Sequence, residues 1–190
     1  MNPYRMTRLA GLFALVSLIT TAAAVRAEAP PGRIDFVGKN AIMTANSTFH
    51  RWKITKSQVD LSKIGDSFVE VEVDLSSVDT GIERRDEHLR TADFFDVEKW
   101  PTATVRVQRA RPTGGDTSGA SGYDADFEIT MHGVTKTIPG HFVIESSSPL
   151  RVVGDLTIDR IDFGIGEPKS WNPLSIEDAV PVHFEATLAS

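Results

Sequence analysis

Residues 68–75 alternate between apolar and acidic side chains, with valines at 69, 71 and 73 and acids at 70, 72 and 74. Successive side chains of a β-strand point to opposite faces, so this spacing places all the apolar groups on one face and all the charges on the other. Such a segment has one face to bury and one to leave in water. The pattern therefore predicts an antiparallel strand at the surface of a core.

Similar alternation recurs along the chain. The predicted strands are residues 33–39, 48–55, 68–75, 103–108, 127–131, 136–144, 152–158 and 182–188. Turn-forming residues separate them, most clearly in the Gly-, Ser- and Thr-rich stretch 112–122, which we interpret as a hairpin loop. Helical segments do not alternate with the strands and no repeat or linker divides the chain, so one all-β domain is predicted.

One segment does not show this alternation of apolar and polar residues. Thr80 and Glu83 have the spacing of a capping box, in which each side chain accepts a backbone N–H at the start of a helix. We expect one capping α-helix over about residues 81–95, since Pro101 prevents a longer one. The alternation alone favours a β-sandwich with a packed core; about eight antiparallel strands are also compatible with a β-barrel, whose interior is either filled by side chains or holds one small ligand. The alternation by itself does not choose between these two interiors.

The first 27 residues have the features of a secretory signal peptide. Arg5 and Arg8 precede an apolar run from about Leu9 to Ile19, and small residues follow up to Ala27. The run is shorter than the about 20 residues that span a membrane. We expect export by the general route, removal of residues 1–27, and one barrel domain over residues 28–190 without stable membrane insertion. The formal net charge of −6 disfavours nucleic acid as a partner.

The residues that could perform chemistry show no metal-binding or catalytic pattern. The histidines are His50, His88, His132, His141 and His183. They lack metal-binding spacing, and there is no cysteine to complete a soft metal site or form a disulfide, so we expect no metal. The G-x-S-x-G elbow, the phosphate-binding glycine loop and the dinucleotide fingerprint are absent, and no catalytic residue is predicted.

Several motifs of the chain resemble those of the YceI family. Asp79-Thr80-Gly81 is followed by Arg85-Asp86-x-His88-Leu89 and by the run Ala-Asp-Phe-Phe-Asp-Val-Glu-Lys-Trp-Pro-Thr-Ala-Thr at 92–104. Ile34-Asp35-Phe36, Gly133-Val134-Thr135-Lys136 and the segment 158–166 agree as well. The resemblance covers about residues 32–188. It departs at Ser47, where the family usually has a glycine, which leaves the local curvature of that strand open.

The resemblance implies a lipocalin-like barrel in the bacterial periplasm that binds polyisoprenoid or fatty-acid-derived molecules, sometimes isoprenoid quinones, without a catalytic mechanism or another cofactor. The charged residues of the helix motif are expected to fasten the helix to the barrel. We expect a long-chain, lipid-like partner, with a homodimer as one option. The predicted ligand-binding residues are Phe36, Phe49, Val71, Val73, Val105, Phe127, Ile129, Phe142, Phe163 and Phe184.

Two alternatives remain open at this point. One is an enzyme acting on a lipid-like substrate, with Asp86, His88 or Asp93 as acid or base. The other is a fully packed, ligand-free barrel used for protein contacts in envelope stress. They differ from a carrier in whether the barrel contains a hole and in where the ionisable groups lie.

Overall fold

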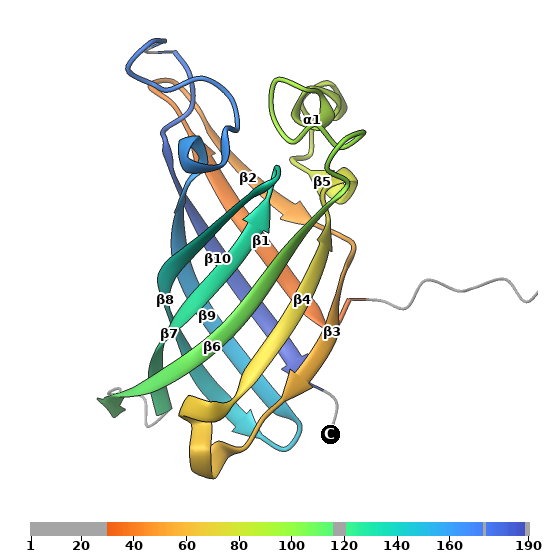
Figure 1. Ribbon diagram of the computed structural model, residues 1–190. Coiled ribbons are helices and arrows are strands. Elements are labelled where there is room, and N and C mark those ends of the chain that lie inside the picture. Colours follow the sequence, from red (N-terminus) through yellow and green to blue (C-terminus); the bar gives the residue numbers. More distant parts are fainter. Residues whose placement is uncertain (1–29, 116–120, 173, 189–190) are drawn as a thin grey trace, which may run out of the picture.

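The computed structural model describes residues 30–115, 121–172 and 174–188. Within these residues ten antiparallel strands form one sheet that curls into a barrel (Figure 1). The strands are β1 (Gly32–Lys39), β2 (Thr44–Phe49), β3 (Trp52–Gln58), β4 (Phe68–Asp74), β5 (Val78–Asp79), β6 (Thr102–Gly115), β7 (Ser121–Met131), β8 (Val134–Ser147), β9 (Leu150–Asp159) and β10 (Ala179–Leu188). The predicted all-β barrel is confirmed.

The strand count differs from the predicted eight because two predicted strands are each divided in two. Predicted strand 48–55 is divided between β2 and β3 at His50 and Arg51, and the chain of predicted strand 68–75 continues from β4 through the short 3-10 turn η2 (Leu75–Ser77) into β5. The two divided strands stay side by side, since β3 pairs with β4 and β2 pairs with β5. Around the barrel they therefore occupy two places, not four.

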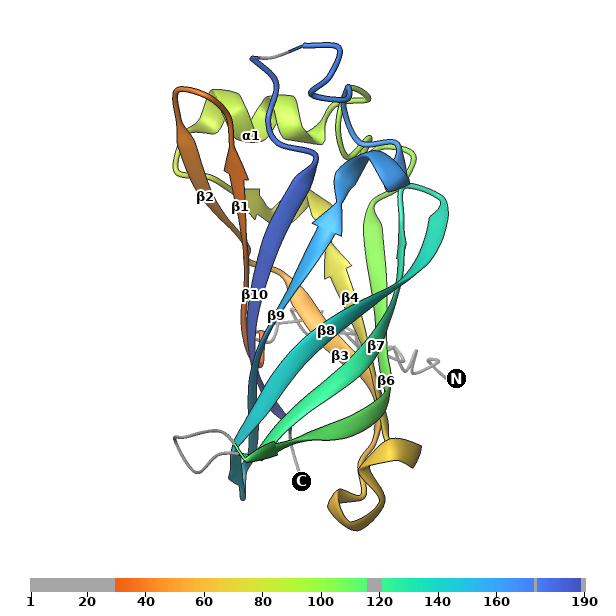
Figure 2. The same ribbon diagram turned by 90° about the vertical axis from the view of Figure 1, so that its left-hand side faces the viewer.

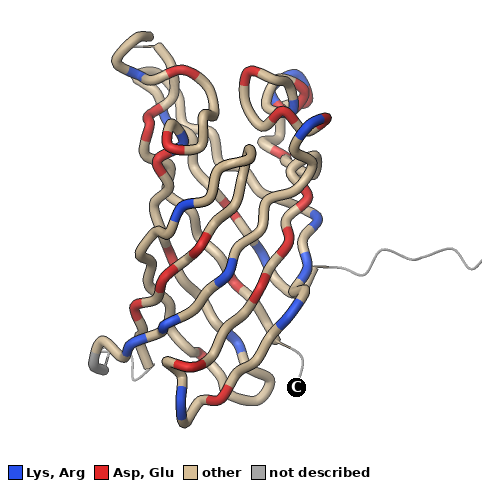
Figure 3. Tube along the Cα trace, viewed as in Figure 1, with Lys and Arg blue, Asp and Glu red and all other residues tan. Residues whose placement is uncertain are grey.

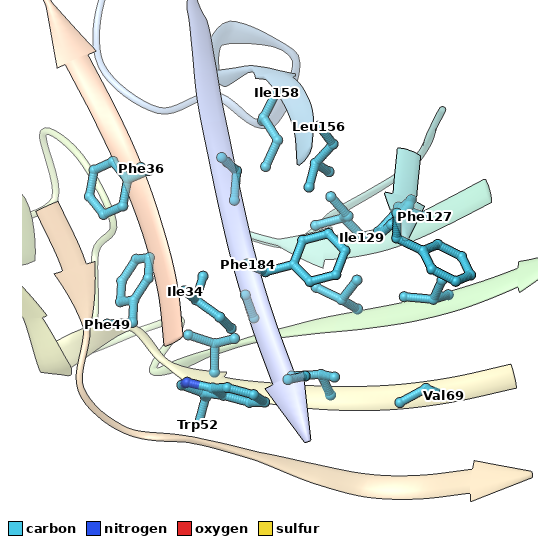
Figure 4. Close-up of a pocket in the computed structure, with 18 of the residues that line it drawn as sticks. Ile34, Phe36, Phe49, Trp52, Val69, Phe127, Ile129, Leu156, Ile158 and Phe184 are labelled. Atoms are coloured by element: carbon cyan, nitrogen blue, oxygen red, sulfur yellow. The ribbon is translucent and has the colours of Figure 1, made fainter. Parts of the chain in front are cut away.

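The division between β2 and β3 follows from a change in side-chain spacing. Phe49 and Trp52 both face the barrel interior although they are three residues apart (Figure 4). Strict alternation would place them on opposite faces, so two consecutive residues, His50 and Arg51, must lie outside. Both of these are exposed. The backbone turns a corner there and is held by hydrogen bonds to the β4–β5 strand, including Asp74 N–H to Arg51 O at 2.9 Å.

The remaining strands follow the chain as simple hairpins. β6, β7, β8, β9 and β10 lie in sequence order, and β10 then pairs with β1, which pairs with β2. The first and last parts of the described chain thus lie side by side, with Phe36 opposite Val182. β6 extends to Gly115 and β7 begins at Ser121, so the strands take up part of the predicted loop 112–122. The rest of that loop, and the predicted signal peptide, lie outside the described residues.

The helix α1 (Glu83–Arg90) is shorter than the predicted 81–95. The predicted capping box does not form, because Ile82 is the N-cap and Thr80 instead donates its backbone N–H to Asp86 at 2.9 Å. After Arg90 the backbone at Thr91 is extended, and tight turns follow up to Trp100. α1, the β1–β2 hairpin and the segment 164–178 gather at one end of the barrel, the helix end (Figure 2).

Positively and negatively charged residues are interspersed along the strands (Figure 3). Neighbouring outward positions form cross-strand ion pairs, such as Lys53 with Glu72 at 2.8 Å and Lys56 with Glu70 at 3.0 Å. These pairs are mostly exposed and contribute little to stability individually. Because the outward-facing residues of the strands are charged, the outer face of the sheet is well solvated.

Asp74, at the corner between β4 and η2, allows the stabilising effect of side-chain hydrogen bonds at this corner to be tested. Its carboxylate accepts from the Ser76 N–H at 2.9 Å and from Arg51 Nε at 2.8 Å. Partial burial works against ionisation, but the bonds from Ser76 and Arg51 outweigh it and hold the pKa of Asp74 below its usual value. We expect Asp74→Ala to lower the free energy of unfolding by about 1–3 kcal/mol at neutral pH, measured by urea denaturation.

The pH dependence follows from the direction of the shift. A carboxyl with a lowered folded pKa contributes stability above its unfolded pKa of about 4, and that contribution is lost as the pH falls through the folded value. The difference between the wild-type protein and the variant should therefore shrink in acid. A difference that is constant from pH 7 to pH 2 would contradict this role of the ionised carboxylate.

Candidate functional site

The barrel encloses a cavity of about 250 Å³. Its walls are built from the inward side chains of β1–β4 and β6–β10, together with residues of α1 and the connecting segments (Figure 4). The lining extends from Gly38 and Ile176 at the helix end to Ile64 and Leu188. The inward faces therefore do not meet across the barrel, and a fully packed interior is not what the structure shows.

The walls are almost entirely hydrocarbon. Apart from the indole of Trp52, the polar side chains among the described lining residues are Ser67, Gln108 and Arg160. Ser67 accepts a hydrogen bond from the N–H of Asp60 at 2.9 Å, and Gln108 accepts one from Arg106 Nε at 3.0 Å. Apolar cavities of this kind stay dry and take apolar guests. A hydrocarbon chain suits this environment because it needs no hydrogen-bonding partners.

Arg160, in the 3-10 turn η3 (Arg160–Phe163), is the cationic residue of the described lining, yet its charge is already balanced. The side chain is 3% exposed and donates from Nη1 to the carbonyl of Ile165 at 2.6 Å. Burial lowers the pKa of Arg160, while Asp178 and Asp159 oppose that shift. Its other bonds go to the carbonyls of Glu167, Ile176 and Glu177 and to the Asp178 carboxylate. Arg160 thus holds the segment 164–178 over the end of the barrel.

Aromatic rings form the wall near the helix end. Phe36 on β1 stacks on Phe49 of β2 with ring centroids 5.2 Å apart, and Phe95 meets both rings edge-on at 6.3 and 5.8 Å. Phe94 and Leu89 line the same region. Leu89 belongs to α1, and Phe94 and Phe95 follow it, so the position of this part of the wall depends on how α1 is held on the barrel.

Two glycines shape the opposite wall. A Cβ on Gly140 of β8 would lie 2.6 Å from the ring of Phe127, and a Cβ on Gly154 of β9 would lie 2.5 Å from the ring of Phe184. The two rings, 5.7 Å apart, therefore lie against backbone where other residues would place a side chain. This close approach keeps both rings at the wall and leaves the centre of the barrel open.

Nine of the ten residues predicted to bind the ligand lie in the cavity wall. They are Phe36, Phe49, Val71, Val73, Val105, Phe127, Ile129, Phe142 and Phe184. Phe163 is the exception. It belongs to η3, is fully buried, and its carbonyl accepts from the His132 ring at 3.0 Å, so it packs beside the β7–β8 turn outside the cavity. Phe163 was predicted as an aromatic residue beside the strand 152–158, and the chain has already entered η3 at that position.

The prediction missed several wall residues, of which Trp52, Ile54 and Arg160 are the most informative. Trp52 and Ile54 were overlooked because the corner at residues 50–51 reverses the alternation. Gly140 and Gly154 could have been noticed, since a glycine inside a strand pattern indicates a close approach. The contributions of Leu89, Phe94 and Ile176 depend on chain segments without strand periodicity, and no local signal identifies them.

The charged residues of the helix motif lie outside the cavity wall and hold the helix. Asp86 is 4% exposed and accepts from both the N–H and the hydroxyl of Thr80, while Arg85 donates to the carbonyl of Thr80 at 2.7 Å. Arg90 donates to the carbonyls of Ser76 and Val78 at 3.0 and 3.1 Å.

The ionisable residues considered for catalysis are therefore separated from the apolar space. Asp86 is committed to Thr80, and His88 and Asp93 form an exposed pair 3.6 Å apart. None of the three lines the cavity. Across the described residues no cluster of three His, Cys, Asp or Glu side chains is placed to hold a metal ion. In the same part of the chain, no helix has the length and hydropathy needed to cross a membrane.

Comparison with known sequences gives a consistent result. The family model of the YceI-like domain matches residues 26–188. A UPF0312 protein of Azotobacter vinelandii is 37% identical over 125 residues, which cover 62% of each chain. A UPF0312 protein of Vibrio campbellii is 34% identical over 113 residues, covering 56% of this chain and 57% of that protein. These matches span less than two thirds of the relatives' own length.

Solved structures share the fold at low sequence identity. BcnA of Burkholderia cenocepacia superimposes with a TM-score of 0.74 at 19% identity, covering 83% of this chain and 96% of that chain. A polyisoprenoid binding domain from Saccharophagus degradans, implicated in plant cell wall breakdown, gives 0.60 at 20% identity, with 85% and 97% covered. The YCEI protein of Campylobacter jejuni gives 0.59 at 18% identity, with 94% and 100% covered.

The close contact between Gly140 and the Phe127 ring leads to a testable prediction. Gly140→Ala should force the ring away from the wall and lower the free energy of unfolding by about 1–3 kcal/mol, as overpacking does. Gly38→Ala is the matched control, because Gly38 also lines the cavity and its Cβ would meet only Ile176 at 4.0 Å. Urea denaturation of both variants measures the effect, and equal stabilities would refute the proposed close fit.

Proposed function

Because this chain belongs to the YceI-like family, we propose that it binds a long apolar molecule, isoprenoid or fatty-acid-derived, inside the barrel and carries or stores it in the periplasm. The observation that carries this proposal is the cavity inside the barrel with hydrocarbon walls. Its shape and apolar walls suit a hydrocarbon chain, which is poorly solvated by water. A role as a binding protein also agrees with the placement of Asp86, His88 and Asp93 outside the cavity.

Burial of the chain provides the driving force. At roughly 0.8 kcal/mol per buried methylene, a tail of about 15 carbons gains on the order of 12 kcal/mol before costs are subtracted. The entropy cost of ordering the tail and restricting its motion offsets much of this gain. The remainder still supports micromolar or tighter binding. Because the attraction has no direction, the depth of the cavity selects the length of the chain more strongly than its chemical type.

The location and the fold neighbours support the same function. The signal-peptide pattern of residues 1–27 predicts export, and an exported barrel would carry an insoluble molecule between membranes. The Saccharophagus domain of the same fold is described as polyisoprenoid binding, which makes a polyisoprenoid a reasonable first ligand to test. Storage, transport and presentation to an enzyme would all use the one cavity.

A direct test is native mass spectrometry of the full chain expressed in a bacterial host, followed by solvent extraction and lipid analysis. We expect a long-chain molecule bound at about one per protein, because an apolar cavity gains free energy whenever a hydrocarbon fills it. Protein of apoprotein mass, combined with failure to bind added polyprenol or fatty-acid derivatives, would overturn the proposal.

A charge placed on the cavity wall should abolish binding. Ile129 on β7 is 3% exposed and faces the cavity, and its neighbour Thr130 faces water. We expect Ile129→Asp to lose lipid co-purification, whereas Thr130→Asp should retain it. Circular dichroism checks that both variants remain β proteins.

If Ile129→Asp does not fold, Ile129→Asn serves in its place, since an amide also penalises an apolar guest but carries no charge. Unchanged lipid content in a folded Ile129 variant would remove this position from the binding wall.

A further inference from the structure

Large apolar side chains that are exposed to water gather at the helix end of the barrel. Six such side chains are strongly exposed among the described residues, and five of them belong to connections at this end (Figure 2). These five, the apolar rim, are Ile42 and Met43 in the β1–β2 turn, Ile82 at the start of α1, and Trp171 and Leu174 in the segment 164–178. Single exposed apolar residues are ordinary, but their concentration at one end of a molecule marks an interaction site.

Hydrogen bonds hold the backbone that presents most of these side chains. The carboxamide oxygen of Asn40 accepts the N–H groups of Ile42 and Met43 at 3.0 and 2.9 Å. The amide nitrogen of the same side chain donates to the Leu174 carbonyl at 3.2 Å, which ties the β1–β2 turn to the segment 164–178. Turning the apolar groups inward would break these bonds. Their exposure is therefore a feature of the ordered fold.

The two connections that carry four of the rim residues are uncharged at their tips. Residues 40–43 are Asn-Ala-Ile-Met and residues 170–175 are Ser-Trp-Asn-Pro-Leu-Ser, in a chain of which 24% is charged. A lysine precedes each tip, Lys39 before the first and Lys169 before the second. Tryptophan and aliphatic side chains flanked by lysine are typical of a membrane–water interface, where the apolar groups enter the bilayer and the ammonium groups stay among the head groups.

We propose that the apolar rim docks the barrel reversibly on a lipid bilayer, with the helix end toward the membrane. This inference rests on the proposed lipid-binding function and names the surface at which the ligand is exchanged. The segment 164–178 connects the two sites, because it contributes Ile165 and Ile176 to the cavity wall. Trp171 and Leu174 of the same segment are 77% and 68% exposed. One segment therefore contacts both the ligand space and the proposed bilayer.

A bilayer suits this surface better than a folded protein partner does. The rim side chains lie on separate connections, and Ile82 is followed by the exposed charged residues Glu83, Arg84 and Glu87 of α1. A protein interface has a continuous apolar centre from which charged residues are largely absent. Lipids are fluid, so they close around separate apolar groups and leave charged neighbours among the hydrated head groups. The formal net charge of −6 favours a neutral lipid surface over an anionic one.

Flotation with phosphatidylcholine vesicles tests the docking. We expect the wild type to float with the vesicles, and a variant with both Ile42→Ser and Trp171→Ser to partition at least about tenfold more weakly, because two apolar side chains leave the interface. The matched control combines Ile42→Leu with Trp171→Phe, which keeps both positions apolar and should keep the binding. All three proteins carry the same N-terminal segment, so differences between them report the rim alone.

Salt and lipid charge separate this mechanism from others. Binding through apolar groups should change little between about 0.1 and 1 M salt, where ionic attraction is screened. A wild type that ignores phosphatidylcholine, or that floats only with phosphatidylglycerol vesicles at low salt, would show that the rim is not an apolar docking surface. A wild-type dimer that the serine variant abolishes, without vesicle binding, would assign the rim to a second copy of the chain instead.

Tryptophan fluorescence shows which surface meets the lipid. Vesicles should shift the emission of the wild type to shorter wavelength, because the exposed Trp171 leaves water. The control variant with Trp171→Phe should still float but lose this shift. Flotation of the wild type without a shift would place the contact elsewhere on the molecule.

The ligand content of the barrel is measured independently by native mass spectrometry. Ile42 and Trp171 do not line the cavity, so the serine variant should contain as much long-chain molecule as the wild type. A wild type that contains lipid but does not dock would overturn the rim as a membrane surface and leave the proposed function standing. A wild type that docks but neither contains nor takes up a long-chain molecule would contradict the proposed function instead.

Discussion

The period of two along a strand is the constraint on which this molecule depends. Every second side chain of β4, β6, β7 and β9 is directed into the barrel, and these inward positions are apolar. The circumference of the barrel keeps opposite walls too far apart for their side chains to meet, and Gly140 and Gly154 let two phenylalanine rings lie against the backbone. A dry hole follows from the geometry of the sheet together with small residues at two positions. The hole is a property of the whole barrel and of no single segment.

The buried charged side chains near the barrel interior have hydrogen-bonding partners within the protein. Arg160 and Asp86 are both buried, and each is hydrogen-bonded within the protein, Arg160 to the carbonyls of Ile165 and Ile176 and Asp86 to Thr80. Buried charges are tolerated when hydrogen bonds replace the lost water. Both residues act at the helix end, where they hold irregular segments over the barrel. The described part of the cavity wall is therefore almost entirely apolar.

Much of the fold was predictable because strand alternation is a local property. The strands 68–75, 103–108 and 127–131 were recognisable from their own residues, and nine of ten proposed wall residues lie in the cavity wall. The errors arose where alternation stops. Phe163 lies in a 3-10 turn, Trp52 follows a corner that reverses the inward face, and Thr80 bonds to Asp86 instead of capping the helix with Glu83. In each case the tertiary structure departs from what the local pattern favours.

The sequence by itself determined that the chain forms antiparallel strands with one apolar face each, because the side-chain period is set by the covalent backbone and by the order of residues; the barrel was implied by the resemblance of its motifs to those of the YceI family. Only the tertiary structure decided that the barrel is hollow and that the charge of Arg160 is already compensated. These properties depend on distances between residues far apart in the chain, such as the approach of Gly154 to Phe184 and of Arg160 to Ile176. Alternation specifies which way a side chain points but not how far away the opposite wall lies.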